Sequence, residues 1–369
     1  MNFNNGRYEI GSHFWLEHTY FRKTKNDLLC FCNSEDSVFT FSGRSAINIA
    51  LRDAMQTKKI IKAYLPSYCC SSMVQPFIEN DISYDFYDVV FNNDEIVYHI
   101  DRNIKADIML IMKYFGTNVE GYDSFISTMQ KKGCIVIEEI THTLLDEEVN
   151  ISGADYCAAS LRKWFPVPAG GMVLKKKGKL QNRPSIVSDR FVRMKIEAMR
   201  DKFDYLSGNN EAKETYLCKF GLFENSLNML DARLKIDNLS KNLLESTNLE
   251  FIKKKRKKNS SLLYKRLSGI NGLKFLNKGF TLEKEVPLFV PIMLPTKKRN
   301  ELRNYLIERK IYCPIHWPEV KGTNAGIREN ELSLVCDQRY DARDMNYMAD
   351  LIIDWCSRNF NVENCTTER

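Results

Sequence analysis

Short apolar runs alternate with segments of helical periodicity through the first half of the chain. The runs that predict strands are 60–65, 84–88, 107–112, 133–137, 154–159 and 172–175. Between them, apolar residues recur at helical spacing near 44–57, 69–80 and 121–132. Strands that alternate with helices are typical of an α/β domain with a mainly parallel sheet.

The second half of the chain has a different pattern. Residues 190–267 are mostly helix-forming, and Gly208-Asn209-Asn210 predicts a break within them. Further on, the pattern predicts two strands and two helices, at 269–275, 288–293, 297–309 and 341–360. We therefore expect a large domain over residues 1–250 and a smaller α/β domain over residues 251–369. A chain of 369 residues, 44% of them hydrophobic, can bury cores of this size.

A run of six basic residues, 253–258, raises the question of nucleic-acid binding. Leu249, Phe251 and Ile252 precede the run and further leucines follow it, so the pattern favours the solvated face of a long helix that joins the two domains. The net charge of +7 is a mild basic bias. It is compatible with phosphate-bearing substrates and is no evidence for a nucleic-acid partner.

The eleven cysteines do not indicate disulfides in a chain of this length. The chain begins Met1-Asn2-Phe3-Asn4-Asn5 without an apolar targeting segment, and no run of about 20 apolar residues occurs. We expect a cytoplasmic protein with reduced thiols and no membrane association. The pairs Cys30-x-Cys32 and Cys69-Cys70 lack histidines at metal-site spacing, so we expect no metal site.

Lys163 is the first candidate for chemistry. It follows the apolar run 154–159, stands three residues after Ser160 and precedes Gly170-Gly171. A lysine that a strand end delivers into such a loop can present its amine to a phosphorylated aldehyde. We therefore interpret Lys163 as a candidate Schiff-base lysine for pyridoxal 5'-phosphate (PLP). Taken alone the run is weak evidence, because a lysine at a strand end is more often a solvated surface residue.

A pair of carboxylates strengthens this interpretation. The apolar run 135–137 predicts a buried strand, and it is followed by Glu138 and Glu139, upstream of Lys163. A carboxylate placed against the PLP ring nitrogen keeps that nitrogen protonated, and we assign this role to Glu139. His142 could then lie against the ring or its phenolic oxygen. The alternative is that the two glutamates only end a strand.

A glycine turn is the third signal. The alternating run 39–41 gives way at Ser42-Gly43 to apolar residues at helical spacing, which predicts a strand, a turn and a helix. The first amides of such a helix form an anion site. We expect Ser42, Gly43, Arg44 and Ser45 to hold the cofactor phosphate, joined by Ser160. Alone, the pattern is an ordinary helix N-cap.

These residues together give a resemblance to a known family. The chain resembles the DegT/DnrJ/EryC1/StrS family of PLP-dependent aminotransferases over nearly its whole length. Besides the Ser42, Glu139 and Lys163 segments, the resemblance is carried by Glu9-Ile10-Gly11-Ser12, Leu65-Pro66-Ser67-Tyr68, Tyr114-Phe115-Gly116, Pro314-Ile315-His316-Trp317-Pro318 and Asp337-Gln338-Arg339-Tyr340.

The resemblance implies the aspartate aminotransferase-like fold (PLP fold type I), with a large, mainly parallel sheet and a smaller C-terminal α/β domain. It also implies a homodimer, because active sites in this family form between two subunits. By motif, Ser42, Gly43 and Arg44 match the phosphate turn and Ser160 the phosphate serine. Glu139 and His142 match the residues at the pyridine ring.

Three departures indicate a divergent branch. Glu139 stands where family members usually have aspartate. The stacking aromatic that often follows the Pro-Ser pair is not evident among Tyr68, Cys69 and Cys70, and we take Tyr68 as its candidate. Ser160 and Lys163 are also closer together than the five-residue spacing common in sugar aminotransferases.

Four residues are candidate substrate contacts. In the resembling family, the segment that contains His316 and Trp317 lies near the substrate entrance, although an aromatic loop packed beneath the small domain is an equal alternative. Arg162 and Arg339 could bind a carboxylate or phosphate, because a planar guanidinium grips such groups with two hydrogen bonds.

The function that follows is an aminotransferase. Its implied amino donor is an amino acid, for which we take glutamate. The implied acceptor is a nucleotide-linked keto sugar of amino sugar or surface polysaccharide synthesis, and Lys163 would also be the base that moves the proton. Two alternatives stay open. One is a PLP-dependent sugar dehydratase, although dehydratase relatives replace the lysine with histidine. The other is a catalytically inactive binding protein with this fold.

Overall fold

The computed structural model describes residues 9–16, 34–146, 153–209, 211–227, 233–277, 284–318, 320–323 and 326–360. The amino-terminal residues 1–5 and the pair Cys30-x-Cys32 lie outside these ranges. Within them, every helix is too short or too polar to cross a lipid bilayer.

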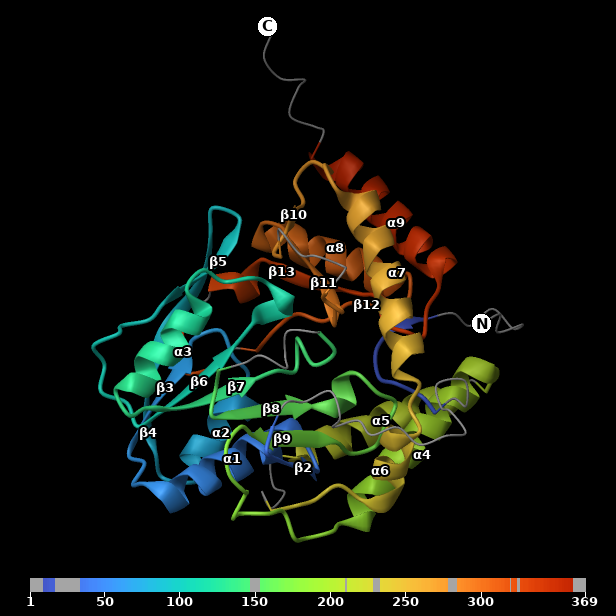
Figure 1. Cartoon of the computed structure of the whole chain (residues 1–369). Coiled ribbons are helices and arrows are strands. Elements are labelled where there is room, and N and C mark those ends of the chain that lie inside the picture. Colours follow the sequence, from blue (N-terminus) through green and yellow to red (C-terminus); the bar gives the residue numbers. More distant parts are fainter. Residues whose placement is uncertain are drawn as a thin grey trace, which may run out of the picture.

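An eight-stranded sheet forms the centre of the first half (Figure 1). Its strands are β2 (Asp36–Thr40), β3 (Lys62–Pro66), β4 (Ser83–Asn92), β5 (Glu95–His99), β6 (Ile108–Met112), β7 (Ile135–Glu139), β8 (Tyr156–Ser160) and β9 (Gly171–Lys175). Their order across the sheet is β2-β9-β8-β7-β6-β3-β4-β5. The run from β8 to β4 is parallel, and the pairs toward both edges are antiparallel. The predicted mainly parallel sheet is therefore confirmed.

Helices cover this sheet as the apolar spacing predicts. They are α1 (Gly43–Thr57), α2 (Ser71–Ile78) and α3 (Tyr122–Lys131). The first packs on β8 and β9, and the third on β7. Strand β6 is buried along its whole length, which explains why it reads as an unbroken apolar run rather than an alternating one. The hydroxyl of Ser42 caps α1 by accepting a hydrogen bond from the Ser45 amide at 3.2 Å.

Four helices follow the sheet: α4 (Asp189–Ser207), α5 (Ala212–Ser226), α6 (Asn238–Glu245) and α7 (Leu249–Leu267). The predicted break at Gly208 lies between α4 and α5, as expected. The long helix α7 leads from this helical region to a second, smaller sheet (Figure 1).

The second sheet is antiparallel, in the order β10-β11-β13. Its strands are β10 (Lys274–Phe275), β11 (Phe289–Met293) and β13 (Glu331–Val335). Helices α8 (Thr296–Glu308) and α9 (Ala342–Phe360) accompany it, near the positions predicted. The strand expected over 269–275 is reduced to its last two residues, and β13 was not predicted. A separate two-stranded pairing joins β1 (Ile10–Gly11) to β12 (Ile311–Tyr312), so the amino-terminal segment lies against the carboxy-terminal half.

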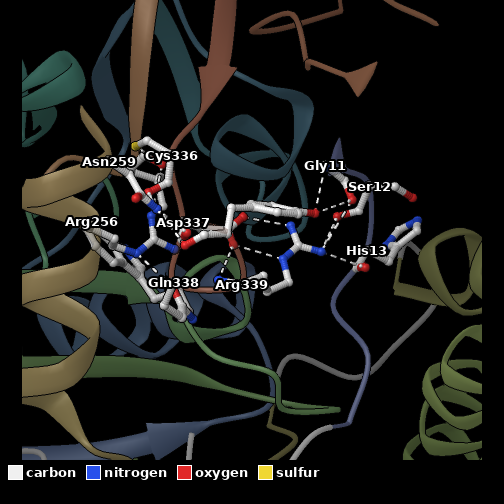
Figure 2. A network of polar contacts seen from close by, with 12 residues as sticks. Gly11, Ser12, His13, Arg256, Asn259, Cys336, Asp337, Gln338 and Arg339 are labelled. Carbon is white, nitrogen blue, oxygen red and sulfur yellow. Dashed lines mark hydrogen bonds and ion pairs between the residues drawn. The ribbon is translucent and has the colours of Figure 1, made fainter. Parts of the chain in front are cut away.

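The basic run on α7 is not wholly solvated, which corrects the sequence interpretation. Arg256 is only 1% exposed, and its guanidinium lies 4.5 Å from the centre of the Trp164 ring. It donates a hydrogen bond to the side chain of Gln338 at 3.0 Å (Figure 2). It also donates to the carbonyl oxygens of Pro287 and Leu288, at 3.2 and 3.0 Å. Arg256 thus ties α7 to the loop that carries Trp164, whereas Lys254 and Lys258 of the same run are exposed.

Replacing Arg256 with alanine should lower the free energy of unfolding by at least about 3 kcal/mol, because two buried carbonyl groups and one side-chain amide lose their donor. The matched change Lys254→Ala, at an exposed position of the same helix, should cost less than about 0.5 kcal/mol. Urea unfolding of both variants measures the difference. Equal, small losses would mean that Arg256 is solvated after all.

The first residue of β9 determines where the Ser42 turn lies. Gly171 pairs with Thr40 of β2 on one side and with Ser160 of β8 on the other. A Cβ atom on Gly171 would lie 2.1 Å from the carbonyl oxygen of Ser42 and 2.5 Å from the Thr40 hydroxyl. Only glycine therefore allows the start of α1 to approach the end of β8 this closely.

The change Gly171→Ala should destabilise the protein by about 2 to 3 kcal/mol, because the methyl group meets backbone that must shift. The control Gly221→Ala lies in α5, where an added Cβ meets no described atom within 4 Å, and should be neutral or stabilising by up to about 1 kcal/mol. Urea denaturation checks both. A Gly171→Ala variant as stable as the unaltered protein would contradict the close approach.

Candidate functional site

Two cavities meet at Lys163. The smaller has a volume of about 230 Å³, and the larger of about 800 Å³. Four described residues line both: Ser160, Arg162, Lys163 and Glu224. The amine-bearing loop therefore separates a small inner cavity from a large outer one.

The carboxyl ends of two neighbouring strands form one side of the small cavity. Glu139 ends β7 and Ser160 ends β8, and both line the cavity. The chain then turns through a short 3-10 helix, η4 (Leu161–Lys163), which brings Lys163 to the same edge. Ligands of open α/β sheets gather at such strand ends.

Two helix N-termini form the opposite side. The cavity is lined by Ser42, Gly43 and Arg44 at the start of α1, and by residues 70–73 at the start of α2. The side chain of Cys70 makes no hydrogen bond that caps α2, and the Met73 amide donates to the carbonyl oxygen of Cys70 at 2.9 Å. An added Cβ on Gly43 would lie 2.9 Å from the Ser160 Cβ, which shows how closely these segments pack. Converging helix N-termini favour an anion, and a phosphate group fits this end.

Glu139 supplies the acidic end of the cavity. Its side chain is 8% exposed, and the amide and hydroxyl of Thr141 both donate hydrogen bonds to it. Burial raises the pKa of Glu139, while the positive charge of Lys163 and the Thr141 hydrogen bonds act against this rise. Thr141 also accepts a hydrogen bond from the Ser160 amide at 2.8 Å. This one threonine therefore fixes the ends of β7 and β8 relative to each other.

Trp317 forms the wall beside the amine. The Nζ atom of Lys163 lies 5.9 Å from the centre of the Trp317 ring. Behind Trp317, the His142 ring stacks on it at 5.5 Å and 27°. The Nδ1 atom of His142 accepts a hydrogen bond from the Phe115 amide, and its Nε2 has no partner among the described residues. Burial holds the pKa of His142 well below its usual range, so its ring is neutral.

The structure does not place every predicted residue at a cavity wall. Tyr68 is buried against Tyr114 and Trp317, with ring centres 4.9 Å apart in both pairs. Ser45 is buried behind the turn, with its hydroxyl 3.0 Å from that of Ser42. His142 and His316 are buried behind Trp317. These four side chains support the wall rather than line the two cavities.

The His316 segment is held by the small sheet. The amide of His316 donates a hydrogen bond to the Glu331 carboxylate at 2.8 Å, and its Nδ1 lies 3.0 Å from the Ser333 hydroxyl. Glu331 is fully buried, and the Ser333 hydroxyl donates to it as well. Strand β13 thereby holds Trp317 over the end of β8.

Arg339 lines the outer cavity, but its guanidinium is engaged within the protein (Figure 2). It forms a two-point ion pair with Asp337 and donates to the carbonyl oxygens of Gly11, Ser12 and His13. These contacts tie the amino-terminal segment to the end of the small sheet. Arg162 differs from Arg339 in lining both cavities, and its guanidinium donates to Glu224 at 3.1 Å.

The small cavity therefore brings together eight of the candidate residues: Ser42, Gly43, Arg44, Glu139, Ser160, Arg162, Lys163 and Trp317. It also contains residues that the sequence did not single out, chiefly the start of α2 and Glu224. The start of α2 follows β3, so the strand-end rule could have found it. Glu224 lies in the last turn of α5, where no local pattern marks it.

Among the known proteins compared with this chain, only solved structures are similar to it. No model of a protein family matches the sequence, and no curated protein does. Solved structures do match. PseC of Helicobacter pylori, an aminotransferase involved in the biosynthesis of pseudoaminic acid, superposes with a TM-score of 0.66 at 13% identity, over 95% of this chain and 100% of PseC.

Two further structures are similar over most of the chain. The proposed sugar aminotransferase Spr1654 of Streptococcus pneumoniae, in its PLP form, gives a TM-score of 0.64 at 12% identity, covering 95% of this chain and 99% of Spr1654. NtdA of Bacillus subtilis with bound cofactor PMP gives 0.60 at 14% identity, covering 92% and 78%. The chain thus has the α/β fold of PLP fold type I aminotransferases, as its sequence predicted.

Proposed function

We propose that this chain is a PLP-dependent aminotransferase of the DegT/DnrJ/EryC1/StrS type. One observation carries the proposal: Lys163, Glu139 and the Ser42-Gly43 turn, which are far apart in the sequence, line the same cavity of about 230 Å³. An amine, a buried acid and an anion-binding turn are what PLP needs at its aldehyde, its ring nitrogen and its phosphate. The fold and the PLP- and PMP-bound neighbours support the same cofactor.

The residues of the cavity fit the cofactor end by end. The starts of α1 and α2 and the Ser160 hydroxyl would hold its phosphate, and Glu139 would hold a proton at the ring nitrogen. Trp317 and Ile47, which also line the cavity, would enclose the ring. When bound, PLP would supply an electron sink for charge that develops on the carbon beside the transferred amine.

Lys163 would have two tasks. Its amine would bind the cofactor in the resting protein. Released by a substrate, the same amine would take a proton from the donor's α-carbon and return it to the cofactor side, as general acid–base catalysis requires. Glu139 would support both steps, because a buried carboxylate at the ring nitrogen stabilises positive charge there.

The outer cavity supports a phosphate-bearing acceptor. Among the residues that the structure describes, seven lysine and arginine side chains line it against three carboxylates. Such a surplus of positive charge favours an acidic substrate. Together with the sugar-related neighbours, it supports a nucleotide-linked keto sugar as acceptor and glutamate as donor, in amino sugar or surface polysaccharide synthesis.

The remaining parts of the proposal follow from the same resemblance. We take residues 1–250 as a large PLP-binding domain and residues 251–369 as a small domain, in a cytoplasmic homodimer. Lys163 argues against a sugar dehydratase, which would release ammonia without any amino donor. A catalytically inactive protein of this fold would give no cofactor spectrum at all.

Addition of PLP to the purified chain should produce a visible absorption band, and Lys163→Ala should abolish it, because no other lysine among the described residues lines the small cavity with Glu139. The control Lys254→Ala, in the solvated part of the basic run, should keep the band. Absorption spectroscopy and equilibrium dialysis separate loss of the bond from loss of binding. An unchanged band in Lys163→Ala would remove Lys163 from this role.

The change Glu139→Gln should leave PLP bound but slow the half-reaction with glutamate at least about 100-fold, because a neutral amide no longer stabilises a protonated ring nitrogen. Glu139→Asp should retain more of the rate. Single-turnover absorbance changes measure both variants. If Glu139→Gln reacts as fast as the unaltered protein, the acid at the ring nitrogen is a different residue.

A further inference from the structure

A charge cluster stands where the two cavities meet. The Glu224 carboxylate of α5 accepts hydrogen bonds through one oxygen from two cations, Arg162 at 3.1 Å and Lys195 at 2.9 Å. Lys195 comes from α4 and lines the outer cavity, whereas Arg162 and Glu224 line both cavities. Arg162 and Glu224 therefore line the same two cavities as Lys163, and Lys195 lines the outer one with them.

The two cations are built in, whereas the carboxylate is open. The side chains of Lys195 and Arg162 are 7% and 14% exposed, but that of Glu224 is 41% exposed. Aromatic rings fix both cations: the Lys195 Nζ lies 4.6 Å and 4.5 Å from the centres of Phe220 and Phe223, and Arg162 lies 5.3 Å from Phe223.

The cluster has more positive charge and more donors than Glu224 uses. The buried Nε of Arg162 has no hydrogen-bond partner among the described residues. Burial lowers the pKa of Lys195 to about 8, although Glu224 acts to raise it, so the amine is still mostly charged at neutral pH. Partial burial of Glu224 would raise its pKa, but the charges of Arg162 and Lys195 outweigh this effect and lower the pKa to about 2. Two cations thus face one carboxylate.

We propose that Arg162 and Lys195 form a binding site for a carboxylate group of the amino donor, and that the Glu224 carboxylate occupies this site until the donor displaces it. The identification of the ligand as the amino donor rests on the proposed function. A second carboxylate can take the place of Glu224 because that side chain is open to the cavity while both cations are held in position. The ligand would gain the free Arg162 Nε as an additional donor.

The position of the cluster suits the carboxylate of the amino donor better than the part of the acceptor substrate that lies far from the reacting carbon. Arg162 and Lys163 line the same two cavities, so a carboxylate held at Arg162 keeps the attached α-carbon in the space that Lys163 also lines. The group that already occupies the site is itself a carboxylate, which argues for this ligand chemistry over phosphate. Arg339 is less suited, because Asp337 already engages its guanidinium.

The test uses glutarate, a dicarboxylate without an amine, which binds such a site but cannot react. Isothermal titration of the full chain at pH 6.5, with PLP present, keeps Lys195 protonated. Glu224→Gln should bind glutarate roughly tenfold more tightly than the unaltered chain, because the competing carboxylate is gone. Adding Lys195→Met to Glu224→Gln should then weaken binding at least tenfold.

The control pairs Glu224→Gln with Lys219→Met. Lys219 is an ion-paired lysine on α5 that lines neither cavity, so this double variant should keep the tight binding of Glu224→Gln. Thermal unfolding checks that each variant is folded. If the variant that carries Lys195→Met does not fold, the comparison of Glu224→Gln with the unaltered chain still tests the inference. The inference is overturned if Glu224→Gln does not tighten glutarate binding, or if inorganic phosphate binds that variant more tightly than glutarate.

The outcome is independent of the proposed chemistry. If the chain gives no visible PLP band but shows the expected changes in glutarate binding, the carboxylate site is supported and the proposed aminotransferase function is contradicted. If the chain gives the PLP band but not the expected changes in glutarate binding, the aminotransferase function is supported and the carboxylate site is contradicted.

Discussion

The parallel pairing of β7 with β8 is the constraint on which the rest of the site depends. It sets Glu139 opposite Ala158, so that Glu139 and Ser160 end at the same edge of the sheet. Thr141 fixes that edge by bonding both the Glu139 carboxylate and the Ser160 amide. Gly171 and Gly43 then let the start of α1 approach it without a side chain between. An acid, an amine and an anion site converge because four segments share one edge.

The small sheet completes this edge from the other side. Glu331 and Ser333 of β13 hold His316, and the next residue, Trp317, forms the wall beside Lys163. A second link runs from Gln338, which donates to the carbonyl oxygen of Trp164 at 2.8 Å and accepts from Arg256. Both halves of the chain therefore position the loop that carries Lys163. Loss of either link should disturb the inner cavity without removing any residue that lines it.

Much of the fold could be predicted from the sequence because its signals are local. A fully buried parallel strand reads as an apolar run, and a helix start reads as a serine and a glycine before helical spacing. The same local rules pointed to Ser42, Glu139, Ser160 and Lys163, since each stands at the end or start of such an element. The structure brings all four to one cavity.

What could not be predicted depends on partners far away in the chain. Arg256 looks like its basic neighbours in sequence, but in the fold it contacts Trp164, Gln338 and two carbonyl groups and is buried. Glu224 and Lys195 belong to helices whose sequence pattern says nothing of the cavity they reach. The sequence left two alternatives for His316 and Trp317, a contact at the site or a packed aromatic loop. Trp317 lines the cavity, whereas His316 packs behind it.

One measurement tests the central claim, that the amine of Lys163 lies within reach of a cofactor held between Glu139 and the Ser42-Gly43 turn. The chain is incubated with PLP, reduced with borohydride and digested, and the modified peptide is identified by mass spectrometry. The account predicts one pyridoxyl group per chain, on Lys163. A label on Lys195 or spread over surface lysines, with Lys163 unmodified, would contradict it.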